Sequence, residues 1–177
     1  MTDLKGAIGD YDKFLEQTLQ ETREAGFDLR DFVQLDHMCY RVSSLEQYDE
    51  KKALLLDLGS LLGENMVNGR PIAVFRLHQP VIYDGWRIDA VELPAPKSGE
   101  DTREGLEHVE FVLYDDKDVF LQKYAGKDFI LRAADRGVNP EIGFKLPNYT
   151  IKFHLLNLPT AVYLQNKLRL TDIKDGQ

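Results

Sequence analysis

A short apolar stretch with a histidine at its third position occurs twice in the 177-residue chain. Residues 35–42 read Leu-Asp-His-Met-Cys-Tyr-Arg-Val, and residues 106–113 read Leu-Glu-His-Val-Glu-Phe-Val-Leu. Each copy has Leu, an acid, His, two further residues and then an aromatic side chain. A repeat that is longer than the common solenoid repeats and occurs only twice predicts two related modules, not an array.

A second pair of matching segments lies downstream of the two histidine segments. Residues 91–94 read Val-Glu-Leu-Pro, and residues 156–159 read Leu-Asn-Leu-Pro. Glu92 follows the first histidine by 55 residues (92 − 37), and Asn157 follows the second by 49 (157 − 108). We therefore expect each module to open on a histidine strand and to close on a strand that ends in Leu-Pro.

Apolar periodicity and capping residues predict the helices of the first half of the chain. Residues 3–25 carry apolar side chains at three- and four-residue steps, which predicts one helix that Gly26 ends. Ser44 and Gln47 have the spacing of a capping box and predict a helix that runs to about Leu58.

Turn residues predict the hairpins that separate the strands. Asn68-Gly69 and Asp84-Gly85 each predict a tight hairpin, because both turn residues accept a positive φ. Pro80 predicts a bulge in the long strand between these turns, and residues 95–105 read as a linker. In the second module we expect a helix through Tyr124, strands over 129–133, 142–146 and 149–158, and a C-terminal helix over 160–170.

The order of the elements predicts an α+β fold. Strands outnumber helices within each module, and the tight turns make the last three strands antiparallel. We expect two paired β-α-β-β-β modules that form an open, incomplete barrel around a shared cleft. The predicted organisation is a single domain over 1–177, with an N-terminal helical extension over 1–34, module 1 over 35–96 and module 2 over 105–170.

Composition excludes several classes of partner. The chain has 30 acidic residues against 22 Lys and Arg and a net charge of −8, which argues against nucleic acid and anionic membrane surfaces. We expect no signal peptide, because no apolar segment follows the charged N-terminal residues, and no apolar run has membrane-spanning length. Cys39 is the single cysteine, so an intramolecular disulfide is excluded, and we expect a cytoplasmic protein. Two modules in one chain also allow a monomer to complete the site.

The alternation of side chains along a strand predicts a site between the modules. The apolar Val109, Phe111 and Leu113 predict the face that packs on a helix, which places His108, and by repeat His37, on the opposite, concave face. Glu92 closes the first module on that same face. His154 has the opposite strand parity from Asn157, which predicts that His154 faces outward. Two imidazoles and a carboxylate are suited to a divalent metal with open positions for a substrate.

Several alternatives stay open from the residues alone. The two histidines are either metal ligands or hydrogen-bonded core histidines. Glu110 is a candidate general base, an alternative fourth ligand or an ion-pair partner of Arg41. Arg41 has the planar fork that suits a substrate carboxylate. Cys39 on the same face is interpreted as a small hydrophobe, because no base is placed to activate it.

The paired β-α-β-β-β order and the His…Glu…His spacing resemble the vicinal oxygen chelate superfamily, which includes glyoxalase I, extradiol dioxygenases, epimerases and bleomycin-resistance proteins. Residues 35–113 look more closely like the YecM family of bacterial proteins. The resemblance implies ligand corners at His37, Glu92, His108 and Asn157. Many metalloenzymes of the superfamily have Glu at the last corner, and the neutral amide of Asn157 is a poorer ligand.

The resemblance implies a metal-dependent enzyme of the isomerase, lyase or oxygenase type. Its cofactor would be a divalent metal ion such as Fe, Zn, Mn or Ni, and its substrate a small oxygen-rich molecule bound in the cleft. Glu110 and Arg41 are the candidate catalytic residues. The alternative is a non-catalytic small-molecule binding protein of the same fold, because the superfamily also includes metal-free binding proteins.

Overall fold

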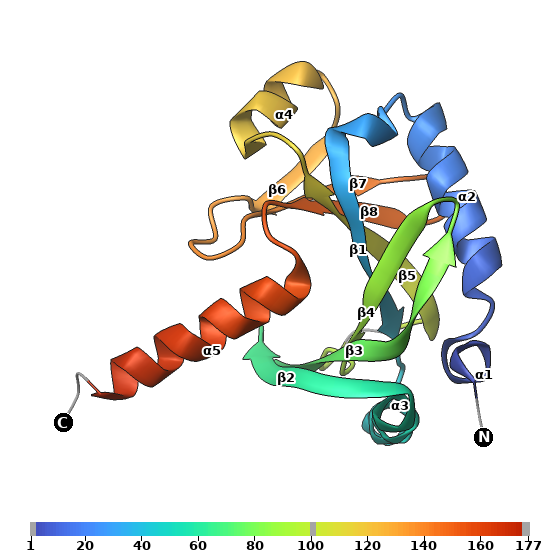
Figure 1. The fold of residues 1–177 in the computed structure, drawn as a ribbon, viewed down its shortest axis with the longest axis vertical. Coiled ribbons are helices and arrows are strands. Elements are labelled where there is room, and N and C mark those ends of the chain that lie inside the picture. The colour runs from blue at the N-terminus through green and yellow to red at the C-terminus, as the bar shows by residue number, and fades with distance from the viewer. Residues whose placement is uncertain (1–2, 100–101, 175–177) are drawn as a thin grey trace.

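One curved, eight-stranded sheet forms the framework of the molecule (Figure 1). The computed structural model describes residues 3–99 and 102–174, with side chains described as far as residue 168. The strand order is β2-β3-β4-β1-β5-β8-β7-β6. The strands are β1 (Phe32–Arg41), β2 (Gly59–Val67), β3 (Arg70–Tyr83), β4 (Trp86–Pro94), β5 (Gly105–Leu113), β6 (Phe129–Ala133), β7 (Glu141–Lys145) and β8 (Thr150–His154).

The two modules meet at the centre of this sheet. β1 and β5 pair antiparallel, and each pairs on its other side, in parallel, with the last strand of its own module, β4 or β8. The order within each half is therefore the same when read outward from the centre. The predicted α+β fold of two β-α-β-β-β modules is confirmed, and the sheet stays open, not closed into a barrel.

The helices follow the predicted order, with one correction. They are α1 (Leu4–Ile8), α2 (Tyr11–Glu24), the 3-10 turn η1 (Leu29–Asp31), α3 (Leu45–Leu58), α4 (Lys117–Lys123) and α5 (Leu158–Lys174). The prediction of a single helix over residues 3–25 is wrong, because the helix is interrupted between α1 and α2. Gly9 adopts a φ of +85°, and the Asp10 carboxylate then accepts a hydrogen bond from the amide of Lys13 and starts α2.

The predicted caps and turns of the first module are present. Ser44 Oγ accepts from the amide of Gln47 at 3.1 Å, and the Gln47 side chain accepts in turn from the amide of Ser43. Asn68-Gly69 and Asp84-Gly85 adopt positive φ at both turn positions and connect β2 to β3 and β3 to β4. The pairing of β3 with β4 shifts register between residues 76 and 81, where Pro80 was expected to form a bulge.

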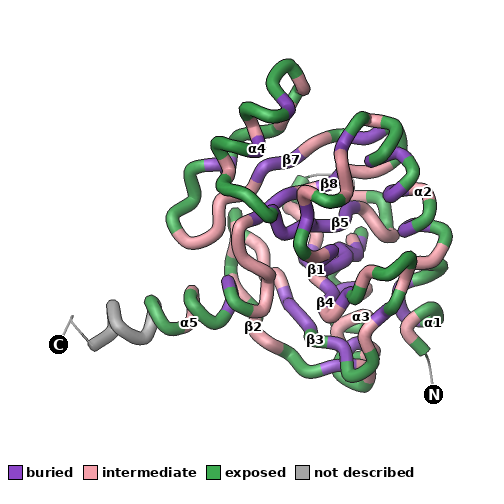
Figure 2. Tube along the Cα trace, turned by 45° about the horizontal axis from the view of Figure 1, so that its top comes forward, coloured by how far each residue is buried: buried purple, intermediate pink, exposed green. Residues whose placement is uncertain are grey.

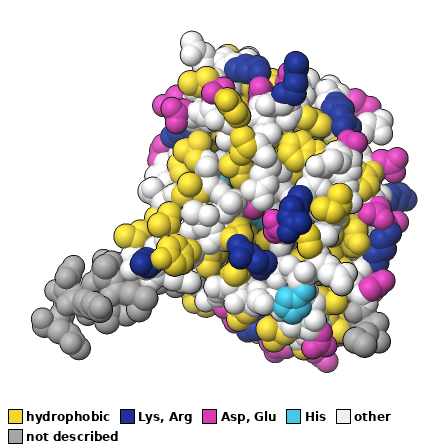
Figure 3. All heavy atoms as spheres, in the orientation of Figure 1, with side chains coloured by type: hydrophobic (Ala, Val, Ile, Leu, Met, Phe, Trp, Pro, Cys, Tyr) yellow, Lys and Arg dark blue, Asp and Glu magenta, His cyan; other side chains and the backbone are white. Residues whose placement is uncertain are grey.

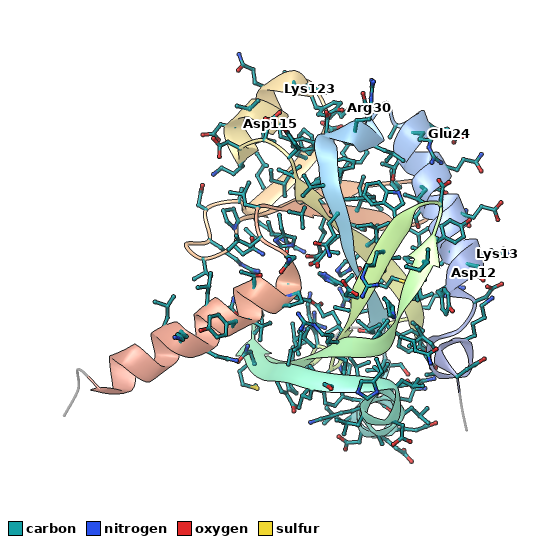
Figure 4. The ribbon with its side chains drawn as sticks, in the orientation of Figure 1. Asp12, Lys13, Glu24, Arg30, Asp115 and Lys123 are labelled. Carbon is teal, nitrogen blue, oxygen red and sulfur yellow. The ribbon has the colours of Figure 1, made fainter. Side chains whose placement is uncertain are left out.

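The convex face of the sheet carries the hydrophobic core. Phe111 of β5 stacks on Phe32 and Phe153, which confirms that the Val109-Phe111-Leu113 face is packed and apolar. The most deeply buried trace runs through β1, β4, β5 and β8 (Figure 2). α2 covers this side with its apolar stripe, while its labelled Asp12, Lys13 and Glu24 point away from the body (Figure 4).

The C-terminal helix α5 lies apart from the other helices. It leaves β8 and projects from the body beside β2, against which its first turns pack (Figure 1). It is longer than the helix expected over 160–170. Residues 100 and 101 of the expected linker lie outside the described residues. None of the described helices is long and apolar enough to cross a membrane.

Candidate metal site in the cleft

The pairing of the two central strands brings the repeated histidines together. In the β1–β5 register His37 lies opposite Glu110, and Cys39 lies opposite His108. The two imidazole rings are 6.3 Å apart between centroids, and both side chains are almost fully buried. The sequence prediction placed both histidines on one face of the sheet, and the structure places them there.

Each histidine is held by the acid that precedes it in the chain. His37 Nδ1 lies 3.0 Å from the Asp36 carboxylate, and His108 Nδ1 lies 2.6 Å from the Glu107 carboxylate. A carboxylate on Nδ1 fixes the ring and leaves Nε2 as the nitrogen that faces the cleft. Metal-binding histidines almost always have such an outer carboxylate, carbonyl or water partner. The repeated acid-His pair therefore orients two Nε2 atoms toward one point.

Two carboxylates lie beside the Nε2 atoms. Glu110 has one oxygen 3.1 Å from His108 Nε2 and the other 3.5 Å from His37 Nε2. Glu92 is the more exposed carboxylate, and its oxygen lies 3.9 Å from His37 Nε2. His37 Nε2 is buried and has no hydrogen-bond partner among the described residues. Ligand atoms of His37, His108 and Glu110 all lie within 4.8 Å of one another, a group whose size suits a metal ion.

The strand registers show that the expected fourth corner was misplaced. Glu92 lies opposite Cys39 in the β1–β4 pair, and Lys152 lies opposite Glu110 in the β5–β8 pair. Because His37 and His108 are equivalent, Cys39 is equivalent to Glu110, and Glu92 is equivalent to Lys152.

The pairing of Glu92 with Asn157 from the Leu-Pro motif is therefore wrong by five residues (157 − 152). Asn157 follows the end of β8, and its side-chain oxygen accepts from the amide of Thr160 at the start of α5. Asn157 is not among the described residues that line the cleft with His108.

The predicted outward orientation of His154 is also wrong. His154 is buried, and its Nε2 contacts the Glu110 carboxylate. The parity expected for β8 was inverted, because it was counted back from Asn157, which is not on the strand. Ile151 and Phe153 instead point into the apolar core, while Lys152 and His154 line the cleft. Assigning the faces of β8 from its parallel pairing with β5, the strand of His108, places both Lys152 and His154 in the cleft.

Burial and opposite charges shift the pKa values of the inner groups. Burial lowers the pKa of His37, but the Glu110 and Asp36 carboxylates outweigh burial and raise it to about 10. Burial raises the pKa of Glu110, but the nearby His154, His37 and Lys152 hold it well below its usual range. Without a metal, the cluster is therefore a set of paired charges, and a metal ion has to displace protons from the imidazoles.

Arg41 is placed differently from the expectation that paired it with Glu110. Its guanidinium donates to the Glu107 carboxylate from Nε at 3.0 Å and from Nη2 at 3.3 Å. Arg41 thereby braces the acid that orients His108. Cys39 is fully buried, and burial raises the pKa of its thiol, which agrees with its interpretation as a small apolar residue.

These groups lie in a cleft of about 680 Å³ between the concave face of the sheet and the first turns of α5. Six Lys and Arg side chains and four Glu side chains line it: Arg41, Arg70, Lys97, Arg132, Arg136 and Lys152, and Glu92, Glu107, Glu110 and Glu141. The lining thus has more cations than anions, although the whole chain has a net charge of −8. Figure 3 shows Lys and Arg side chains in the middle of the face that carries α5.

Similarity to solved structures defines the class of fold. The solved structure of Protein EC4020 has a TM-score of 0.71 at 28% identity and covers 85% of this chain and 86% of its own. Methylmalonyl-CoA epimerase from Streptomyces coelicolor, in complex with 2-nitronate-propionyl-CoA, has a TM-score of 0.51 at 15% identity, with 70% and 96% covered. The protein therefore has the fold of the vicinal oxygen chelate superfamily.

The chain belongs to the YecM family, whose model matches residues 3–125. Protein YecM of Escherichia coli strain K12 is 29% identical over 150 residues, which are 85% of this chain and 73% of that protein. An uncharacterised protein of Haemophilus influenzae is 37% identical over 110 residues, 62% of this chain and 54% of that protein. The resemblance to the YecM family that was stated from the sequence is thus confirmed.

Proposed function

We propose that the protein is a divalent-metal-dependent enzyme that acts on a small oxygen-rich substrate in the cleft. His37, His108 and Glu110 would hold the metal, and Glu92 lies next to them as a further carboxylate. The observation that carries the proposal is the repeated acid-His pair, which directs two buried Nε2 atoms toward one buried carboxylate. A further reason is that the buried His37 Nε2 makes no hydrogen bond with any of the described residues, because buried polar atoms without hydrogen bonds are rare.

The donor set limits the kind of metal. Two imidazoles and carboxylate oxygens suit Zn, Fe, Mn or Ni, and a set of three protein ligands leaves positions for a substrate. A metal bound there would supply Lewis-acid stabilisation of negative charge on substrate oxygens. The chain's own residues orient the imidazoles through Asp36 and Glu107 and exclude water from the inner cluster.

The residues around the ligands are suited to binding and proton transfer. Glu92 is the accessible carboxylate, with 15% of its side chain exposed against 3% for Glu110. We therefore assign Glu92 the role of general base at a substrate carbon or oxygen, instead of the catalytic role first expected for Glu110. Arg41 acts through Glu107 and is a positioning residue for His108.

A second candidate function is a metal-free binding protein of the same fold. The observation that favours it is the charge pairing of Glu110, which already has contacts with His108, His154 and Lys152. In this case the buried cluster is a structural network, and the cleft sequesters a small molecule without reaction.

Elemental analysis of protein purified without chelators separates the two candidates. The enzyme proposal expects about one divalent metal ion per chain, and it expects loss of that ion in Glu110→Gln. Loading with Fe²⁺ and testing oxygen uptake with catechols, against isomerisation of dicarbonyl adducts with Zn²⁺, Ni²⁺ or Mn²⁺, then assigns the reaction type. Protein that stays metal-free after exposure to all four ions supports the binding protein.

A further inference from the structure

Lys152 occupies a position in the cleft that the sequence pattern did not reveal. By strand register it is the counterpart of Glu92, so the two modules place opposite charges at equivalent points. Its ammonium lies 3.2 Å from Glu110 and 3.4 Å from Glu141. The Lys152 side chain is four-fifths buried, and it lines the same cleft as His108 and His154.

A second cation with an unused donor lies in the same cleft. Arg70 of β3 donates from Nη1 to the carbonyl of Ala95 at 2.8 Å, but its buried Nε has no hydrogen-bond partner among the described residues. Arg70, Lys152 and Glu92 all line this one cleft. A buried N–H donor without an acceptor is costly, and an anionic ligand oxygen would satisfy it.

We infer that the cleft is built for an anionic substrate, whose carboxylate or phosphoryl group Lys152 and Arg70 recognise. This inference rests on the proposed function and names the substrate class of the same site. Lys152 is then a specificity-determining residue. A substrate that presents an oxygen to the metal would bring its negative charge within reach of the Lys152 ammonium. The equivalent position of the first module carries the carboxylate of Glu92 instead.

The same position predicts how Lys152 affects the metal. An ammonium cannot ligate a metal, so the fourth corner contributes no protein ligand. It also competes for the Glu110 oxygen at 3.2 Å and repels a nearby cation. Lys152 therefore weakens the binding of the metal alone and strengthens the binding of an anion to the metal-loaded protein. A purely structural lysine would not have these two opposite effects.

The test uses the full chain and two small probes that chelate metals through adjacent oxygens. Oxalate carries two negative charges, and oxamate has almost the same shape with one. Calorimetric titrations measure Mn²⁺ binding to the metal-free protein, and then binding of each probe with and without Mn²⁺. The variants are Lys152→Gln, Lys152→Arg and Arg70→Gln, and Lys145→Gln on the neighbouring strand is the matched control for an exposed lysine.

We expect Lys152→Gln to bind Mn²⁺ about fivefold more tightly and oxalate roughly ten- to hundred-fold more weakly, since hydrogen bonds between charged groups contribute that much. Oxamate should lose less than oxalate. Arg70→Gln should also weaken oxalate, while Lys152→Arg and Lys145→Gln should stay near the wild type. Thermal melting shows whether each variant is folded.

The inference is overturned if Lys152→Gln, folded, binds oxalate within twofold of the wild type, or if its Mn²⁺ binding weakens along with oxalate. Failure of the proposed function gives a different result. In that case the wild type binds no Mn²⁺, and the inference then depends on oxalate binding to the metal-free protein. Loss of that binding in Lys152→Gln and Arg70→Gln supports it, and no loss rejects it.

Discussion

The two modules share the same strand order, but they contribute different side chains to the site. Both contribute an acid-His pair from the central strands, with Nδ1 of each ring held by the preceding carboxylate. At the other two equivalent positions they diverge. Module 1 has Cys39 and Glu92, whereas module 2 has Glu110 and Lys152. The repeat therefore sets where the side chains point. Differences at only two equivalent positions give the second module its buried carboxylate, Glu110, and its cation, Lys152.

The largest effect is expected when either histidine is removed. His37→Ala and His108→Ala should each weaken metal binding by more than about a hundredfold, since changes to outer partners alone cost 10–100-fold. Because the modules are equivalent in this respect, the two losses should be similar. Calorimetry with Zn²⁺ measures them, and His78→Ala, an exposed histidine of β3, is the matched control. Full metal content in both variants would make the repeat a feature of folding alone.

The second effect concerns the pH dependence of stability in the chelator-treated protein. The pKa of His37 is about 10 in the folded state, above its ordinary value of 6.5, so its contribution is complete below about 6.5 and is lost as pH rises toward 10. Burial raises the pKa of Glu107, but the neighbouring His108 and Arg41 outweigh burial and lower the pKa below its usual range. The contribution of Glu107 to stability is therefore complete above about pH 4.5 and is lost on acidification.

Stability should therefore be highest between about pH 4.5 and 6.5 and fall by a few kcal/mol toward pH 10. Urea unfolding at a series of pH values measures this, and His37→Gln should flatten the alkaline decrease. Stability that rises between pH 7 and 10 would show that His37 is neutral in the folded protein. Metal affinity should show the opposite trend and strengthen as pH rises, because bound metal displaces protons.

A smaller effect separates the two outer carboxylates. Asp36→Asn and Glu107→Gln should each weaken metal binding by roughly 10–100-fold, because each loses the charge that orients an imidazole. They should differ in stability. Asp36 is 2% exposed and also accepts from the amide of Leu158, whereas Glu107 is 38% exposed and pairs with Arg41. Chemical denaturation should therefore show the larger loss for Asp36→Asn, and equal losses would contradict the comparison.

The smallest effect is expected at Asn157, the residue that the sequence motif equated with Glu92. Asn157→Ala should cost about 1 kcal/mol of stability, because its side chain caps α5. It should leave the metal affinity unchanged. Asn157→Asp preserves a capping oxygen and is the control. A loss of metal in Asn157→Ala, measured with Zn²⁺, would restore Asn157 as a ligand.

Local sequence patterns predicted most of the fold and, within the site, the two histidines and their shared face. The acid-His repeat identified the two central strands, and the Asn-Gly and Asp-Gly turns identified the hairpins, because each depends on residues close in the sequence. The fourth corner depended on which residue of β8 pairs with β5, and register between distant strands is set by packing. The similarity of Val-Glu-Leu-Pro to Leu-Asn-Leu-Pro pointed five residues too far along the chain.

The break at Gly9 and the position of His154 were missed for related reasons. Apolar periodicity continues across residues 3–25, so it does not report a turn that one positive φ introduces. His154 was assigned to the wrong face because alternation was counted from Asn157, which lies beyond the strand. Periodicity gives the correct face only when the end of the strand is known.

We propose that one metal ion binds between the two modules through His37, His108 and Glu110. Anomalous X-ray scattering from crystals soaked in Zn²⁺ or Mn²⁺ tests it most directly. We expect one strong peak within about 2.0–2.2 Å of both Nε2 atoms and of a Glu110 oxygen, with Lys152 moved off that oxygen. A peak held by other residues, or no peak while Lys152 stays on Glu110, would contradict it.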